Sequence, residues 1–159
     1  MPSITHIPFH DISGKIYRSP MPFGSNDPDQ DIYQEMKDIQ VTAIVMLTSD
    51  EEALQKSGRQ LRNLYQKDGF NVIHLPIPDF DIPDRKLLQL ALAETIDLAK
   101  QGQNIAIHCS AGCGRTGLFL AEMAKVILEL PGKQAIEWIR QCLPCAVETE
   151  EQIRFIQEN

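Results

Sequence analysis

A short apolar strand, a glycine-rich loop and a long apolar helix follow one another without a break in this chain. The run Asn-Ile-Ala-Ile at residues 104–107 predicts a buried strand, and residues 118–130 predict a mostly buried helix. Between the two lies the sequence His108-Cys-Ser-Ala-Gly-Cys-Gly-Arg-Thr-Gly117. The pattern therefore places a cysteine where a strand ends and an arginine where a helix begins, on the same short loop.

This loop has the composition of an anion-binding site. Its successive backbone amides can point into one concavity, and the helix start adds unpaired N–H donors and the positive end of the helix dipole. Gly112 and Gly114 allow the positive φ that such a tight loop needs. The positive field favours the nucleophilic thiolate of Cys109, and Arg115 can donate two parallel hydrogen bonds to an oxyanion. We expect a phosphate over the cysteine sulfur, bound by Ser110, Ala111, Gly112, Cys113, Gly114 and Arg115.

Bulk composition narrows the class of protein. With 159 residues, of which 43% are hydrophobic, the chain is expected to form a single domain over residues 1–159. The net charge of -7 disfavours nucleic acid and anionic membrane surfaces as main partners. The sequence has no signal-peptide pattern and no apolar run near the length of a membrane span, so we expect a cytoplasmic protein without a membrane segment. Export as an effector by a non-standard signal is the alternative.

Apolar periodicity predicts alternating strands and helices along the chain. We expect strands at 15–18 (at an edge of the sheet), 41–47, 71–77 and 104–108, and helices at 29–40, from a cap at Ser49 or Asp50 to 68, and at 84–101, 133–143 and 149 onward. This alternation predicts an α/β fold in which helices flank a central, mostly parallel twisted sheet of about 4–5 strands.

Phosphoryl transfer to a cysteine needs an acid that protonates the leaving oxygen. The loop Pro78-Asp79-Phe80-Asp81-Ile82-Pro83 offers two carboxyl groups, those of Asp79 and Asp81. The alternative for this segment is a solvated acidic turn in which Asp84 caps the next helix. The residues alone leave the choice between these interpretations open.

The glycine-rich loop also fits a second pattern. Gly112-x-Gly114-x-x-Gly117 matches the dinucleotide-binding fingerprint, which requires a second strand after the helix. Residues 133–143 follow instead, and their periodicity is helical, so the sequence disfavours a dinucleotide site.

Residues 108–117 resemble the signature His-Cys-x5-Arg-Ser/Thr-Gly of the cysteine-dependent protein tyrosine phosphatase superfamily. The loop is most similar to the tyrosine-specific branch, whereas the chain length is similar to the compact dual-specificity and cell-cycle-phosphatase-like members. The resemblance covers a core of residues 41–155 and implies a phosphatase-like fold.

Two further segments carry the same resemblance. Residues 78–83 resemble the mobile acid loop of the family, which implies Asp79 as the general acid, although Asp81 stands where that loop has glycine. Residues 148–155 resemble a segment whose second glutamine orients water, although Glu148 stands where that segment has its first glutamine. This implies a water-orienting role for Gln152, with a capping box to Thr149 as the alternative or additional role.

The resemblance implies a hydrolase that works in two steps through a phosphocysteine. Cys109 attacks phosphorus while Asp79 protonates the leaving oxygen, and water oriented by Gln152 then hydrolyses the intermediate. Arg115 and the loop amides hold the phosphoryl oxygens, and Thr116 donates its hydroxyl to the cysteine sulfur. The implied substrate is a phosphorylated protein, phosphotyrosine before phosphoserine or phosphothreonine. No metal or cofactor is expected, and the oligomeric state is not set by the sequence.

Other activities fit parts of this pattern. A catalytically silent phosphoprotein-binding module would keep the loop without turnover. Thiol chemistry of the sulfurtransferase or arsenate-reductase kind would use the cysteine without the acid loop. A lipid or inositol phosphate phosphatase is a further alternative, but such relatives often carry basic residues at the loop positions that here are Ser110, Ala111 and Cys113.

The other three cysteines suggest redox control of the loop. A reactive Cys109 is expected to oxidise to the sulfenic acid, which a neighbouring thiol can capture. Cys113 is one candidate for that thiol, and Cys142-x-x-Cys145 is an accessory pair whose alternative is a helix end followed by a turn.

Overall fold

The computed structural model describes residues 3–158 and contains one five-stranded sheet. The strands are β1 (Thr5–Ile7), β2 (Ile16–Ser19), β3 (Val41–Met46), β4 (Asn71–His74) and β5 (Asn104–His108). Their order across the sheet is β1-β2-β5-β3-β4; β1 pairs antiparallel with β2, and all other neighbours are parallel. The predicted α/β fold with a mostly parallel sheet is confirmed.

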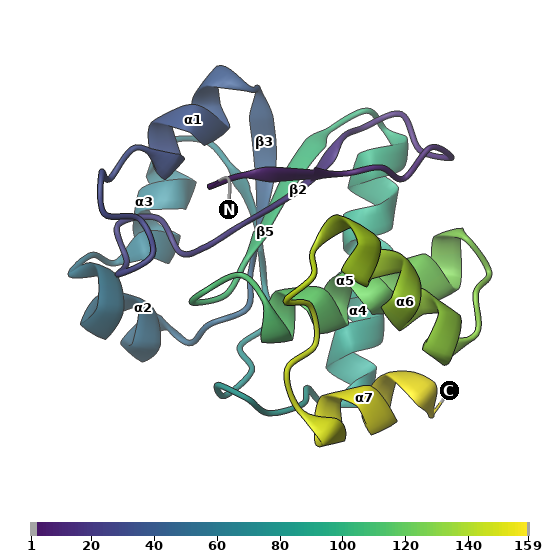
Figure 1. Cartoon of the computed structure of the whole chain (residues 1–159). Helices are drawn as coiled ribbons and strands as arrows, with labels where there is room; N and C mark the ends of the chain where they lie inside the picture. The colour runs from purple at the N-terminus through teal and green to yellow at the C-terminus, as the bar shows by residue number, and fades with distance from the viewer. Residues whose placement is uncertain (1–2, 159) are drawn as a thin grey trace.

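Helices lie on both sides of this sheet (Figure 1). One side holds α1 (Ile32–Asp38), α2 (Asp50–Ser57) and α3 (Leu61–Lys67), and the other holds α4 (Arg85–Lys100), α5 (Gly114–Ile127), α6 (Gly132–Cys142) and α7 (Glu150–Gln157). Successive side chains along a strand point to opposite faces of the sheet, so each face has its own apolar core. In β3, Ala43 and Val45 pack into the core of the α4–α7 side, whereas Ile44 and Met46 pack into the core of the α1–α3 side.

Helix α5 is the central helix of the larger core, as its apolar sequence predicts. Every residue from Gly114 to Ala124 is buried. Close packing at its start requires glycine at 117, where a Cβ atom would collide with the backbone and side chain of Ala146. The helix begins at Gly114, so Arg115 and Thr116 belong to its first turn, as the prediction of an arginine at the helix start requires; it ends at Ile127, before the expected residue 130.

Several elements differ from the predictions. β1 was not predicted, and β4 ends at His74 rather than at 77. The strand expected at the edge of the sheet is an interior strand, because β1 pairs with the outer side of β2. The single helix expected from 49 or 50 to 68 is broken into α2 and α3, because Gly58 adopts a left-handed conformation with φ 71° and ends α2. Of the two candidate caps, Ser49 caps α2 by accepting a hydrogen bond from the amide of Glu52. No helix in residues 3–158 has the length and apolarity that a membrane crossing requires.

Candidate active site

The site forms at the carboxyl ends of the parallel strands, where the glycine-rich loop connects β5 to α5. Cys109 follows the last residue of β5, and its side chain is only 3% exposed. The loop closes where the amide of Gly117 donates to the carbonyl of Cys113, which begins the helix. Gly112 has φ 82°, as predicted. Gly114 does not have a positive φ; a Cβ atom at that position would instead collide with the carboxylate of Glu148.

The backbone amides of this loop are unpaired. The N–H groups of residues 110–115 donate no hydrogen bond to another group within residues 3–158, although the carbonyl of Ser110 accepts one from the amide of Met21. Unpaired backbone donors in a protein interior are rare, and clustered amides at a helix start form an anion-binding concavity. All six predicted phosphate-binding residues therefore contribute an available donor to one loop.

Arg115 is buried beneath this loop, with 1% exposure, and is held by a carboxylate from α2. Its Nη1 and Nη2 atoms each donate to one oxygen of Glu52 at 2.8 Å, and Nη1 also donates to the carbonyl of Ile77 at 2.7 Å. Its Nε atom is buried and has no hydrogen-bond partner in residues 3–158. Burial lowers the pKa of Arg115. The hydrogen bond to Glu52 and the charges of Cys109, Glu52 and Asp79 raise this pKa by more, so its net shift is upward and the guanidinium stays charged. The hydrogen bond from Arg115 lowers the pKa of Glu52 to about 2, so this pair is ionic at neutral pH.

The two acidic candidates of the 78–83 loop have different surroundings. Asp79 Oδ1 lies 3.2 Å from Nη2 of Arg115, and Asp79 Oδ2 lies 3.6 Å from Nζ of Lys56. The carboxylate of Asp81 turns back onto its own loop and accepts the amide of Ile82 at 2.8 Å. Asp84 caps α4, as the alternative interpretation expected. The structure thus brings Asp79, and not Asp81, to the arginine of the phosphate loop.

Lys56 completes a small ionic cluster at the mouth of the site. Its Nζ atom donates to Glu52 at 2.9 Å and to the hydroxyl of Ser110 at 3.1 Å. One turn of α2 separates Glu52 from Lys56, so both side chains lie on the face of the helix that meets the loop. This helix therefore supplies both the carboxylate that orients Arg115 and a cation at the rim.

The Gln152 side chain is buried and bound to backbone groups at both ends. Its Oε1 atom accepts the amides of Glu148 and Thr149 at 2.9 and 3.3 Å, and its Nε2 atom donates to the carbonyl of Asp81 at 3.1 Å. The capping box with Thr149 is present, as the alternative interpretation expected. Gln152 thereby joins the start of α7 to the acid loop. Both lone pairs of its oxygen are occupied, so it can bind a water only through the Nε2 amide, which has two N–H groups.

His108 and Thr116 flank the nucleophile in the buried part of the loop. His108 Nδ1 lies 3.0 Å from the carbonyl of Cys109, which can only accept, so Nδ1 carries the proton and Nε2 accepts from the hydroxyl of Tyr65 at 2.9 Å. Burial lowers the pKa of His108 to about 4. The predicted hydrogen bond from Thr116 to the Cys109 sulfur is absent: within residues 3–158 the buried Thr116 hydroxyl has no partner.

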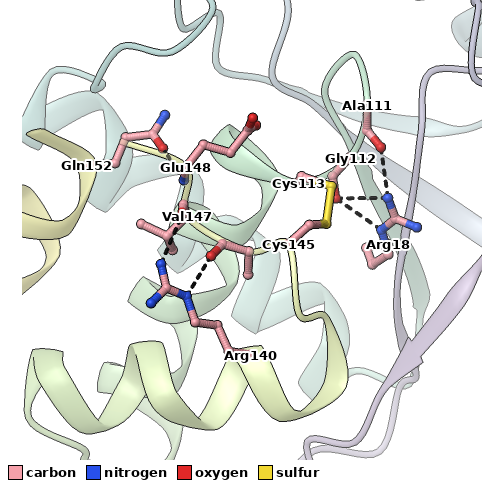
Figure 2. The surroundings of a disulfide bond; sticks show 10 residues. Arg18, Ala111, Gly112, Cys113, Arg140, Cys145, Val147, Glu148 and Gln152 are labelled. Carbon is pink, nitrogen blue, oxygen red and sulfur yellow. Dashed lines mark hydrogen bonds between the residues drawn. A yellow bond between two sulfur atoms is a disulfide. The ribbon is translucent and has the colours of Figure 1, made fainter. Parts of the chain in front are cut away.

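A disulfide joins the phosphate loop to the segment before α7 (Figure 2). It connects Cys113 to Cys145, whose Cα atoms are 5.3 Å apart. Cys142 is free and ends α6, so of the two interpretations for residues 142 and 145 the structure shows the helix end followed by a turn, and not a pair. Cys142 is the last residue of α6, and the chain turns after it, so that Cys145 alone reaches the loop. The amide of Val147 also donates to the carbonyl of Cys113, at 3.3 Å.

Three residues of the site lie outside the motifs that the sequence analysis selected. Glu52 and Lys56 had no distinct signal, because an acidic first turn and an i,i+4 ion pair are ordinary features of a helix. The third is Arg18 of β2, which is 1% exposed and donates to the carbonyls of Ala111 and Gly112 (Figure 2). An arginine sharing a strand face with apolar Ile16 was the available signal for it.

The donor set suits an oxyanion rather than a metal. Arginine and amide N–H groups line the loop, and residues 3–158 contain no cluster of three or more His, Cys, Asp or Glu side chains placed to hold a metal ion.

Comparisons with known proteins agree with this geometry. The sequence matches the family described as "Polymorphic toxin system, DSP-PTPase phosphatase" over residues 21–127. The tyrosine-protein phosphatase cdc-14 of Caenorhabditis elegans is 29% identical over 126 residues, which cover 79% of this chain and 16% of that protein. The present chain spans 57% or less of the length of the first curated relatives that it matches.

Solved structures share the fold over nearly the whole chain. A kinase-associated phosphatase whose catalytic cysteine was replaced by serine superposes with a TM-score of 0.87 at 22% identity, covering 98% of this chain and 92% of that one. The phosphatase Tk-PTP in its active form superposes with a TM-score of 0.79 at 28% identity, covering 99% of this chain and 98% of that one.

Proposed function

The chain belongs to the DSP-PTPase phosphatase family of polymorphic toxin systems, and from this premise we propose that it hydrolyses phosphate monoesters of proteins through a phosphocysteine, without a metal ion. One observation carries the proposal: the loop that begins at Cys109 leaves the amides of residues 110–115 unpaired, next to a buried Arg115 whose Nε atom also has no partner in the described part of the chain. These donors match the equatorial oxygens of a phosphoryl group in transfer.

In the first step, the thiolate of Cys109 attacks phosphorus and forms the S–P bond while the P–O bond to the leaving group breaks. Asp79, in its protonated form, gives its proton to the departing oxygen. Both carboxylates accept an amide of their own loop, but within residues 3–158 only that of Asp79 also lies next to Arg115, which supports this assignment over Asp81. The loop amides and Arg115 hold the three equatorial oxygens throughout.

In the second step, water attacks phosphorus, the S–P bond breaks and Asp79 takes the proton of the water. We propose Gln152 as the residue that orients this water through its Nε2 amide, which has a second N–H besides the one that it donates to the Asp81 carbonyl. Thr116 is proposed to rotate its unpaired hydroxyl toward the departing thiolate, which the absence of another partner in residues 3–158 permits.

We propose phosphotyrosine as the preferred substrate, with phosphoserine and phosphothreonine next. The variable loop positions Ser110, Ala111 and Cys113 carry no positive charge, and the rim bears Asp79, Asp81 and a single lysine, Lys56, already paired with Glu52. Such a rim disfavours substrates with several phosphates, because their additional charges would find few cations. A faster rate on a phosphoinositide than on a phosphotyrosine peptide would overturn this order.

Redox sensitivity is also proposed for Cys109. Peroxide would oxidise the thiolate to the sulfenic acid and be reduced to water. Cys113 is the cysteine nearest to Cys109 in the sequence, but it is already bonded to Cys145. A dithiol must first reduce this disulfide before the Cys113 thiol can react with the sulfenic acid of Cys109. Mass spectrometry after peroxide treatment tests this: a disulfide from Cys109 to Cys113 is expected only in protein that was first reduced.

The proposed activity is tested by hydrolysis of para-nitrophenyl phosphate in the presence of a chelator. The native protein should turn over, and Cys109→Ser should lose roughly 10⁴-fold or more in kcat while retaining affinity for tungstate, a phosphate-like oxyanion. Negligible turnover by both proteins, with tungstate still bound, would instead identify a silent phosphate-binding module. Turnover that the chelator abolishes would contradict the proposed mechanism.

A further inference from the structure

A second arginine contacts the phosphate loop from the side of the sheet. Arg18 lies in β2 opposite Ile107 of β5, so it reaches the loop from the strand next to the one that precedes it. Its Nη2 atom donates to the carbonyls of Ala111 and Gly112, both at 2.9 Å, and its Nε atom donates to Gly112 at 3.1 Å. These three hydrogen bonds bind two consecutive carbonyls near the tip of the loop to a rigid strand.

The orientation of those carbonyls fixes the orientation of the next two amides. In a trans peptide the C=O of one residue and the N–H of the following residue point in opposite directions. With the carbonyls of Ala111 and Gly112 turned toward Arg18, the N–H groups of Gly112 and Cys113 point away from it. Both amides belong to the unpaired set of residues 110–115.

The local conformation depends on the same contact. Gly112 has φ 82°, a conformation that glycine adopts readily, and a Cβ atom there would collide with Nη2 of Arg18 and with the carbonyl of Ser19. The loop therefore lies directly against the arginine, with no room for another side chain between them. Without the guanidinium, these two peptides would keep no other hydrogen bond from residues 3–158 to their carbonyls.

We propose that Arg18 is a positioning residue for oxyanion binding: it turns two peptides of the phosphate loop so that the amides of Gly112 and Cys113 face the bound anion. The inference rests on the proposed function only in that the anion is taken to be the phosphoryl group of a substrate. Arg18 itself acts from behind the loop and through its backbone.

The charge of Arg18 supports the same role. Burial lowers the pKa of Arg18, and the negative charge of Cys109 offsets only part of this effect, because the guanidinium lies within electrostatic range of the nucleophile. A buried cation on the far side of the loop adds to the positive field that an oxyanion meets. An arginine that only joined β2 to the fold would have no need to face this loop.

Arg140 provides a matched control (Figure 2). Its Nε and Nη2 atoms donate to two consecutive carbonyls, those of Ala146 at 2.9 Å and Val147 at 2.8 Å. Like Arg18, it is an arginine that holds a turn of backbone, but the turn lies outside the phosphate loop. Replacing each arginine by methionine therefore removes comparable hydrogen bonds from two neighbouring segments.

The experiment measures tungstate affinity by calorimetry, well below the melting temperature of each variant. Arg18→Met should weaken tungstate binding by about tenfold or more, as the loss of hydrogen bonds to a charged group predicts. Arg140→Met should change it less than about twofold: its hydrogen bonds go to Ala146 and Val147, which within residues 3–158 hydrogen-bond to the loop only at Cys113, and the disulfide from Cys145 still holds that residue. Arg18→Lys keeps the charge but not the planar guanidinium, so its loss of tungstate affinity should lie between those of the other two variants. It replaces Arg18→Met in the test if that variant does not fold.

Affinity in Arg18→Met or Arg18→Lys equal to that of the native protein would overturn the inference, as would an equal loss in Arg140→Met. A failure of the proposed function is recognised separately: the native protein would then bind tungstate without hydrolysing para-nitrophenyl phosphate. Because tungstate binding needs no turnover, the role of Arg18 is tested in either case.

Discussion

The phosphate loop at 108–117 and the acid loop at 78–83 serve the same site, but the rest of the protein holds them very differently. The phosphate loop is fixed by Arg18 from the sheet, by the disulfide from Cys113 and by the carboxylate behind Arg115. In the acid loop, Phe80 is 58% exposed with φ 64°, a conformation that costs a bulky residue about 1–2 kcal/mol. Contacts from other segments include the ion pairs of Asp79, the hydrogen bond from Gln152 and the packing of Ile82 against the larger core.

The difference matches the role that we propose for each loop. Hydrogen-bond donors for a phosphoryl group stabilise it best when they need no rearrangement, so a heavily anchored loop suits them. A proton carrier has to reach the leaving oxygen in one step and a water in the next, and segments with few buried contacts open at low free-energy cost. The anchors of the first loop and the sparse contacts of the second can be removed separately.

The largest effect is expected from the acid loop. Asp79→Asn should lower kcat by about 10²–10⁴-fold for substrates with poor leaving groups, because the departing oxygen then lacks a proton donor. The loss should be smaller for para-nitrophenyl phosphate, whose leaving group is stable as an anion. Rates on a series of aryl phosphates check this. Asp81→Asn is the control, and a larger loss there would transfer the acid role to Asp81.

A stability effect is expected from the disulfide anchor. Cys145→Ser should lower the free energy of unfolding by about 2–4 kcal/mol, because the bond closes a segment with a sequence separation of 32. Urea denaturation without reductant measures the change. Reductant should bring the native protein to the same stability and leave the variant unaffected, whereas Cys142→Ser should behave as the native protein does. Reductant-independent stability of the native protein would show that the bond is not formed in solution.

The buried His108 makes the anchored region sensitive to acid. Burial lowers its pKa to about 4 in the folded state, whereas the unfolded chain has the ordinary value near 6.5, so the unfolded chain binds the proton first as pH falls. Stability should therefore fall between pH 6.5 and pH 4, by up to about 3 kcal/mol from this group. Urea unfolding across that range measures it, with His108→Gln as the comparison. An identical pH profile for the variant would contradict the assignment.

The smallest effect is expected at the contact between α7 and the acid loop. Gln152→Met removes the hydrogen bond to the Asp81 carbonyl and should destabilise the protein by about 1–3 kcal/mol. Thr149→Ala, which removes only the helix cap, is its control. Rapid-mixing kinetics separates the two roles of Gln152: a burst of phenol release means that the variant hydrolyses the phosphocysteine slowly, and a slow first step without a burst means that Gln152 chiefly holds the acid loop.

Local patterns in the sequence predict the parts of this site that are contiguous. The loop at 108–117, its strand and its helix are recognised because their apolar runs and glycines follow in order, and Ser49 and Asp84 were found as caps by the same kind of local chemistry. The fold class follows from the alternation of strands and helices. Gly58 was available as a signal for the break between α2 and α3, but the apolar face of 54–65 outweighed it.

The parts that were missed depend on pairing between distant segments. Arg18 reaches the loop only because β2 lies beside β5, and the strand order cannot be read from either strand alone. Glu52 likewise meets Arg115 only through the packing of α2 beside the loop. The partner of Cys113 cannot be chosen among the other cysteines until the turn after α6 is known. The predicted edge position of β2 failed for the same reason, because β1 is too short to give a clear periodicity.

The place of β2 in the sheet has a consequence for how the protein is made. Arg18 contacts Ala111 across 93 positions of sequence, and β2 has no parallel neighbour until β5 has been synthesised. Contacts of such long range form late, because the entropy of closing the intervening chain has to be overcome first. During synthesis, the N-terminal strands and helices would thus be complete while the phosphate loop is still unformed. We likewise expect anion binding to be among the last properties to appear during refolding.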